Sequence, residues 1–137
     1  MRLQLSTNSN IHNILQIIND AKLYLKSKEI DQWQHGYPNK SQIEKDIANN
    51  ESYVLINDAN QVIATSMFSI RPEPTYKVID GEWKIKESEK YGVIHRLAIH
   101  KNHRKKGIAS HILNEFHQLL KKQQIRSLKI DTHEDNH

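Results

Sequence analysis

The segment from residue 92 to residue 131 restricts the possible folds more than any other part of the chain. Its first run, GVIHRLAIH, is rich in β-forming residues and predicts a buried strand. A basic linker and Gly107 follow, and behind the glycine an apolar stripe recurs at helical spacing. The stripe consists of Ile108, Ile112, Leu113, Phe116, Leu119 and Leu120. The run SLKID predicts a last strand through Asp131, so the segment has the spacing of a parallel β-α-β crossover.

The N-terminal part of the chain predicts one strand and two helices. Residues 1–6 alternate in polarity and predict a short strand, and apolar residues at helical spacing predict a helix over about residues 9–26. A second, short helix is predicted over residues 41–49. Ser41 is its expected cap, because Glu44 follows three residues later in the capping-box arrangement.

Between these helices and the β-α-β segment, the runs SYVLI and VIATSMFSI predict an antiparallel hairpin around the turn NDANQ. Pro72 and Pro74 are expected to end its second strand, because proline cannot donate to a central ladder. Residues 72–91 are then predicted to form an irregular connection. The predicted fold class is therefore α+β, a mixed α/β fold, with a parallel unit at its C-terminal end.

The composition is that of one folded domain over residues 1–137. No apolar run is long enough to cross a bilayer, and the first residues lack the apolar core of a secretion signal. We therefore expect a cytoplasmic protein without contact to a membrane. The absence of cysteine excludes disulfides, thiolate nucleophiles and cysteine-based zinc sites. A formal net charge of +4 favours anionic partners.

Gly107 lies at the predicted start of the helix, directly behind Arg104, Lys105 and Lys106. A helix start leaves backbone N–H groups without partners and carries a partial positive charge, and both features suit a phosphate. Glycine also allows an anion to approach the backbone closely. The pattern fits a pyrophosphate site, and it fits equally a basic loop in which the glycine only turns the chain. No G-x-G-x-x-G or G-x-x-x-x-G-K-[ST] motif is present.

The same residues resemble motif A of the GNAT superfamily, the Gcn5-related N-acetyltransferases. In that family a strand ends in a Leu-Ala-Val-like triplet, and Arg/Gln-x-x-Gly-x-Gly/Ala then opens a helix. This chain has LAI at 97–99 and RKKGIA at 104–109. The preceding β-α-α-β-β order and the run SLKIDTHEDN also fit the family. The resemblance implies a GNAT-like fold with a mixed, mostly antiparallel sheet flanked by helices.

The resemblance further implies an N-acetyltransferase that moves the acetyl group of acetyl-CoA directly to a primary amine of a small molecule or a protein. The backbone N–H groups of 104–109 would hold the pyrophosphate, and Leu97 to Ile99 would pair with the pantetheine arm. An N–H near Leu97 would polarise the thioester carbonyl. The implied cofactor-binding residues are Leu97, Ala98, Ile99, Arg104, Lys105, Lys106, Gly107, Ile108, Ala109, Ser110 and Asn136.

His95 is the leading candidate for the catalytic base, because imidazole titrates near neutrality. The alternative is a packed or hydrogen-bonded strand histidine. Arg96 is expected on the opposite face of the strand, in a structural or substrate-contacting role. The run THEDNH does not make a convincing metal site, so no metal is expected.

Four aromatic residues are candidates for the wall of the acceptor pocket: Trp33, Tyr37, Tyr76 and Trp83. The same residues could instead anchor loops on the core. The acceptor itself is not identified by the sequence.

In the family, a helix and two strands usually follow the position of Asn136, and this part often supplies a tyrosine that protonates the thiolate of CoA. No such tyrosine can be assigned here. We expect either a shortened chain with an exposed sheet edge or a homodimer that covers this edge. A non-catalytic acyl-CoA-binding module is the alternative function. Nucleic-acid binding through 101–106 and 121–129 is disfavoured, because no recognised motif frames these basic clusters.

Overall fold

The structure, a computed structural model, describes residues 1–29, 38–79, 82–104 and 107–130, and for residues 73–79 and 82–89 it describes the backbone alone. The elements follow in the order β1 (Arg2–Leu5), the short helical turn η1 (Asn8–Asn10), α1 (Ile11–Ser27), α2 (Lys40–Ala48), β2 (Ser52–Ile56), β3 (Val62–Ile79), β4 (Glu82–Ile99), the turn η2 (Lys101–His103), α3 (Ile108–Lys122) and β5 (Ser127–Ile130). The predicted helices and the predicted short strands are therefore confirmed within a few residues.

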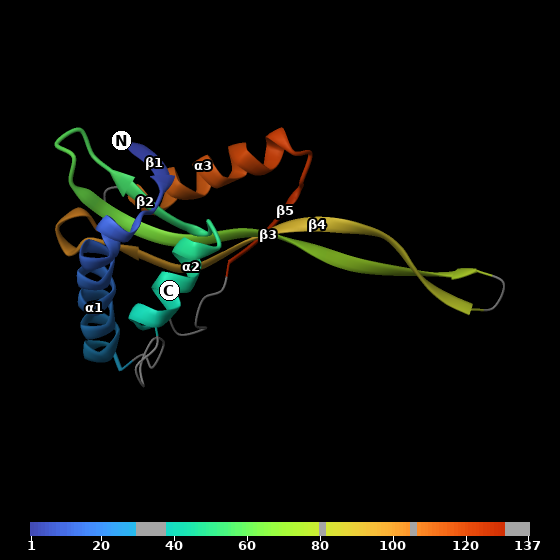
Figure 1. Cartoon of the computed structure of the whole chain (residues 1–137), viewed down its shortest axis with the longest axis horizontal. Helices are drawn as coiled ribbons and strands as arrows, with labels where there is room; N and C mark the ends of the chain where they lie inside the picture. Colours follow the sequence, from blue (N-terminus) through green and yellow to red (C-terminus); the bar gives the residue numbers. More distant parts are fainter. Residues whose placement is uncertain (30–37, 80–81, 105–106, 131–137) are drawn as a thin grey trace.

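The strands form one sheet in the order β1-β2-β3-β4-β5. The first three pairings are antiparallel, and β4 pairs with β5 in parallel. Helices α1 and α2 lie on one face of the sheet and α3 on the other (Figure 1). The predicted fold class, a mixed and mostly antiparallel sheet flanked by helices with a parallel β-α-β unit at its end, is confirmed.

The core on the α3 side of the sheet is built from the predicted stripe of the helix. Its buried members are Ile108, Ile112, Phe116 and Leu120. The rings of Phe68 and Phe116 stack with their centroids 4.2 Å apart. Gly92 lies under the helix, where a Cβ atom would come within 2.8 Å of Cδ1 of Leu120. The glycine therefore allows α3 to approach the sheet closely.

A second cluster fills the other face of the sheet. It joins Ile14, Ile17 and Ile18 of α1 to Ile43 of α2 and to Val54 of β2. All five of these side chains are buried. The apolar spacing of α1 is thus explained by packing against the sheet, and α2 is held to the same face through Ile43.

The cap of α2 differs from the prediction. Helix α2 begins at Lys40, and Asn39 is its N-cap: the Asn39 side chain accepts a hydrogen bond from the Gln42 amide at 3.0 Å. Ser41 is not the cap, because it already lies within the helix. Asn39 has the extended backbone of a cap residue, and its side chain satisfies an amide that the helix itself leaves unpaired.

The prediction that Pro72 and Pro74 end the strand is wrong, as is the prediction of an irregular connection over residues 72–91. Strand β3 continues to Ile79 and pairs with β4 as a long ribbon that projects from the body of the molecule (Figure 1). Among the described residues, β2 pairs with β3 only as far as Met67. Beyond that point one side of β3 is an open edge, where proline is tolerated, and the register shifts beside Pro74.

Candidate functional site

Strand β4 contains a β-bulge at Arg96. On β3, Thr65 pairs with Ala98 and Met67 pairs with His95, so Arg96 and Leu97 together lie opposite the single residue between Thr65 and Met67. Arg96 has a φ of 54°, a left-handed conformation that costs a residue other than glycine of the order of 1–3 kcal/mol. Such a conformation persists only where the surrounding structure holds it.

A buried ion pair holds the bulge. Nε of Arg96 donates to Oδ2 of Asp46 at 2.8 Å, and Nη2 donates to Oδ1 of the same carboxylate at 2.8 Å. The two side chains are only 9% and 5% exposed. Nε2 of Gln42 also donates to Oδ1 of Asp46, at 3.0 Å. A bidentate pair of this kind fixes geometry as well as charge, so α2 is tied directly to the bulge.

The bulge also overturns the expectation that Arg96 and His95 lie on opposite faces of the strand. Gly92 and Ile94 face α3, which places His95 on the face away from α3 by strand alternation. The extra residue of the bulge breaks the alternation, and Arg96 reaches Asp46 of α2 on that same face. Both side chains therefore belong to the α1 and α2 side of the sheet.

Beyond the bulge, one edge of β4 is open as far as the described residues go. Strand β5 pairs with β4 from Tyr91 to Ile94, and no other described strand lies along that side of β4 from His95 to Ile99. Backbone groups on this edge can pair with an extended ligand, as an added strand would. Leu97, Ala98 and Ile99, the residues expected to bind pantetheine, all lie on this stretch.

The start of α3 is not covered by any described residue. Gly107 is the N-cap, with φ 71°, and the first backbone bond of the helix runs from the His111 amide to the Gly107 carbonyl at 3.0 Å. The amides of residues 107–110 make no hydrogen bond to any other described residue. A Cβ atom on Gly107 would meet no described atom within 4 Å. The positive φ therefore requires the glycine, and its surroundings leave room for an anion at the unpaired amides.

Arg104 adds a cation just before this helix start. Its guanidinium lies over the ring of Tyr24, 4.9 Å from the centroid. Its Nη2 atom is buried and has no hydrogen-bond partner among the described residues, and the same holds for Nδ1 of His103. Buried polar atoms without partners are rare and call for an explanation. An anion seated at this corner would supply an acceptor for Arg104.

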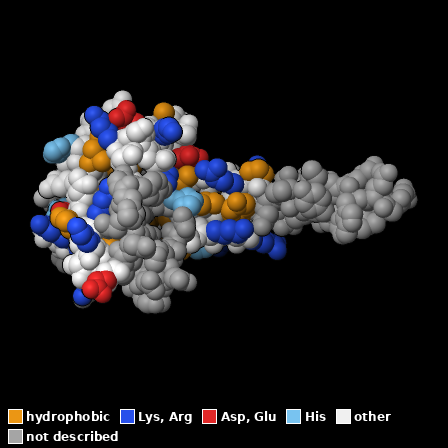
Figure 2. Space-filling view, turned by 90° about the horizontal axis from the view of Figure 1, so that it is seen from below, with side chains coloured by type: hydrophobic (Ala, Val, Ile, Leu, Met, Phe, Trp, Pro, Cys, Tyr) orange, Lys and Arg blue, Asp and Glu red, His pale blue; other side chains and the backbone are white. Residues whose placement is uncertain are grey.

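His95 lines a hollow of about 410 Å³ on the face of the sheet away from α3. The other described residues that line it are Arg71, Tyr91, Val93, Lys129 and Ile130. Figure 2 shows this face, with Lys and Arg, histidine and hydrophobic side chains together where the described part of the ribbon leaves the body. Sequence reasoning missed Arg71 and Lys129, because only the strand register brings them beside His95.

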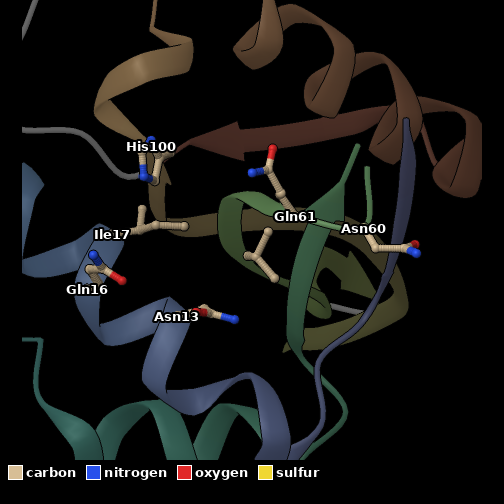
Figure 3. Close-up of a pocket in the computed structure, with 7 residues that line it drawn as sticks. Asn13, Gln16, Ile17, Asn60, Gln61 and His100 are labelled. Carbon is tan, nitrogen blue, oxygen red and sulfur yellow. The ribbon is translucent and has the colours of Figure 1, made fainter. Parts of the chain in front are cut away.

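A second hollow, of about 290 Å³, lies further along β4 (Figure 3). Asn13, Gln16 and Ile17 of α1 line it from one side, and His100 lines it from the end of β4. Nδ1 of His100 accepts a hydrogen bond from the amide of Asn102 at 3.1 Å. His100 is thus oriented by its own loop, five residues beyond His95 in the chain, and the two histidines line different hollows.

Trp33, Tyr37, Lys105, Lys106 and Asn136 lie outside the described residues.

Tyr76 and Trp83 lie on the β3–β4 ribbon, where Tyr76 pairs with Ile85 and Trp83 pairs with Val78. Trp83 precedes His95 by twelve residues of one strand, which is roughly 40 Å of extended chain. Their role in an acceptor pocket stays a prediction.

In the described part of the chain, no group of three or more potential metal ligands comes together. No helix of that part is long and apolar enough to span a membrane.

The model of the "Acetyltransferase (GNAT) family" matches residues 13–137. The sequence matches no curated protein.

Among solved structures, a GNAT-family acetyltransferase from Streptococcus agalactiae is 25% identical, with a TM-score of 0.74 over 98% of this chain and 77% of that one. An aminoglycoside 6'-N-acetyltransferase from Acinetobacter haemolyticus is 16% identical, with a TM-score of 0.64 over 99% and 82% of the two chains. A predicted acetyltransferase with acetyl-CoA, from Clostridium acetobutylicum, is 19% identical, with a TM-score of 0.62 over 97% and 81%.

Proposed function

Because the chain belongs to the GNAT acetyltransferase family, whose members transfer acetyl groups from acetyl-CoA, we propose that it acetylates a primary amine by direct transfer. The observation that carries this proposal is the juxtaposition of two features in one β-α-β unit. In the described part of the chain, the edge of β4 is open from the bulge onward, and the amides of residues 107–110, at the start of α3, have no hydrogen-bond partner.

The pyrophosphate of CoA would be bound by the start of α3. The unpaired amides of residues 107–110 and the helix dipole favour a negative charge there, and Arg104 has a buried donor to offer. The pantetheine arm would lie along Leu97 to Ile99 as an added strand. The thioester would then lie beside the bulge, and the Leu97 amide is our candidate for the donor that stabilises the oxyanion. Such a contact is worth roughly 3 kcal/mol in comparable sites.

His95 would accept the proton that the amine loses. The amine nitrogen attacks the carbonyl carbon of the thioester, and the tetrahedral intermediate collapses with cleavage of the C–S bond, so that the CoA thiolate leaves. A positioned base of this kind contributes about 10²–10⁴ in rate. His95 directly precedes the bulge and faces the hollow in which an acceptor would lie, which supports this role.

Thermal unfolding tests the cofactor site. Acetyl-CoA at 100 times its Kd should stabilise the protein by about 2.7 kcal/mol, which is roughly 8 °C for a domain of this size. Gly107→Glu should abolish the shift, because it places a carboxylate at the amides and a side chain at a positive φ. Asn50→Glu is the matched control, since Asn50 is exposed and also has a positive φ, of 56°.

Three outcomes are informative. No thermal shift of the wild-type protein at saturating acetyl-CoA would overturn the proposed cofactor site. Equal thermal shifts for wild-type protein and Gly107→Glu would show that the cofactor does not bind at the start of α3. A normal shift without release of CoA thiol from any amine in a broad panel would indicate the alternative, a module that binds acyl-CoA without transferring its acyl group.

A further inference from the structure

We propose that the acceptor is a small amine that also carries an anionic group, a carboxylate or a phosphate, bound by Arg71 and Lys129. This inference rests on the proposed function and names the substrate class of the same site. It comes from the hollow beside His95, where the described lining residues include these two cations and none of them is acidic.

The strand register places the two cations on either side of β4. Arg71 of β3 pairs with Tyr91, and Lys129 of β5 pairs with Val93. Tyr91, Val93 and His95 alternate along β4, so their side chains share the face away from α3. Two residues of a strand span roughly 7 Å. Measured along β4, the partner of Lys129 lies one such step from His95, and the partner of Arg71 lies two steps from it.

Local contacts orient both cations at the hollow. Nε of Arg71 donates to Oγ of Ser69 at 3.1 Å, and its terminal Nη groups make no hydrogen bond to a described residue. Nζ of Lys129 lies 4.2 Å from the centroid of the Tyr91 ring. The guanidinium end of Arg71 can therefore offer two parallel donors to a carboxylate or phosphate, with the charge of Lys129 on the far side of β4.

The hollow has the size and the charge for such a molecule. A volume of about 410 Å³ lies in the range of small-molecule sites. Two fixed cations repel an acceptor with several positive charges and attract one that brings a negative charge. The anion would be bound between β3 and β5, and the amine at the other end of the molecule would reach His95 and the bulge.

Matched amines test the charge preference. Pentylamine, 5-aminopentanoate and cadaverine share a five-carbon chain and differ in the distal group, and ethanolamine is compared with its phosphate ester in the same way. We expect kcat/KM to be at least tenfold higher for an anionic member than for its neutral partner, and lowest for cadaverine. The two series distinguish a carboxylate from a phosphate.

Variants tie the preference to the two residues. Arg71→Gln and Lys129→Gln should each raise KM for the preferred anionic amine about tenfold and should change KM for pentylamine much less. Lys90→Gln is the control, because Lys90 is exposed on β4, between the strands of Arg71 and Lys129, and is not among the described residues that line the hollow. A neutral or cationic amine whose kcat/KM equals that of the anionic amines would overturn the proposal. A preference for anionic amines that persists when Arg71→Gln and Lys129→Gln are combined would also overturn it.

Binding separates this inference from the proposed function. If no amine is acetylated, the proposed function is wrong. The inference about the anionic group can still be tested by calorimetric titration of the protein–CoA complex with the same amines. Binding of 5-aminopentanoate or phosphoethanolamine that is lost in Arg71→Gln supports it. No binding of either anionic amine, or binding that Arg71→Gln leaves unchanged, overturns it.

Discussion

The ion pair between Asp46 and Arg96 allows a prediction with a defined magnitude. Asp46→Ala removes the carboxylate and leaves the guanidinium of Arg96 buried, with only 9% of the side chain exposed. Two bonds of 2.8 Å are lost, and breaking a buried pair by removing one partner costs about 3–5 kcal/mol. We therefore expect urea unfolding to report a loss in this range, and the melting temperature to fall by roughly 10 °C.

A double-mutant cycle separates the pair from its surroundings. Asp46→Leu combined with Arg96→Met replaces the charges with apolar groups, which is often neutral or stabilising in other buried pairs. Stability should therefore recover in the double variant, with a coupling energy of about 2 kcal/mol or more. A loss below about 1 kcal/mol in Asp46→Ala, or a cycle without coupling, would refute the view that this pair stabilises the fold.

The same double variant tests the role of the pair in holding the bulge. The left-handed conformation at residue 96 costs of the order of 1–3 kcal/mol, so it should relax when the carboxylate no longer holds the side chain. We expect kcat for acetyl transfer to fall at least tenfold in the double variant, with little change in the Kd of acetyl-CoA. Unchanged kcat at restored stability would show that the bulge does not need the ion pair.

Two further predictions concern the core. Gly92→Ala places a Cβ atom 2.8 Å from Cδ1 of Leu120 and 3.1 Å from Cε2 of Phe68. We expect urea unfolding to show that the free energy of unfolding falls by about 1–3 kcal/mol. A stability equal to that of wild-type protein would mean that α3 shifts freely. Burial raises the pKa of Tyr53 above 10.0, so the folded state holds this proton more tightly than the unfolded state, and stability should fall as the pH rises through and above 10. Tyr53→Phe should reduce that fall in alkaline unfolding curves and have no pH-dependent effect below pH 9.

Much of the fold could be predicted because its elements have strong local patterns. The apolar stripe of α3 and the glycine at its start are close in sequence. Both can be recognised from the spacing of residues along a single helix. The capping of α2 shows the limit of such patterns. Asn39 and Ser41 are both good cap residues, and only the backbone conformation decides between them.

The site was less predictable, because its parts depend on long-range register. Asp46 and Arg96 are fifty residues apart, and nothing near either residue indicates the other. The bulge places the Arg96 side chain on the face of the sheet opposite to the one that strand alternation predicts. An irregularity of one residue cannot be recognised in the alternating sequence. Arg71 and Lys129 meet beside His95 only through the pairing of three strands.

The bulge has a consequence for how this strand can change in length. Before it, the even positions Gly92 and Ile94 pack toward α3, and after it the odd positions Leu97 and Ile99 do so. Deleting one residue here would turn every later side chain of the strand to the wrong layer, whereas replacing a residue disturbs one position. We therefore expect insertions and deletions between His95 and Ala98 to be tolerated far less than substitutions, although this stretch lies at an open edge.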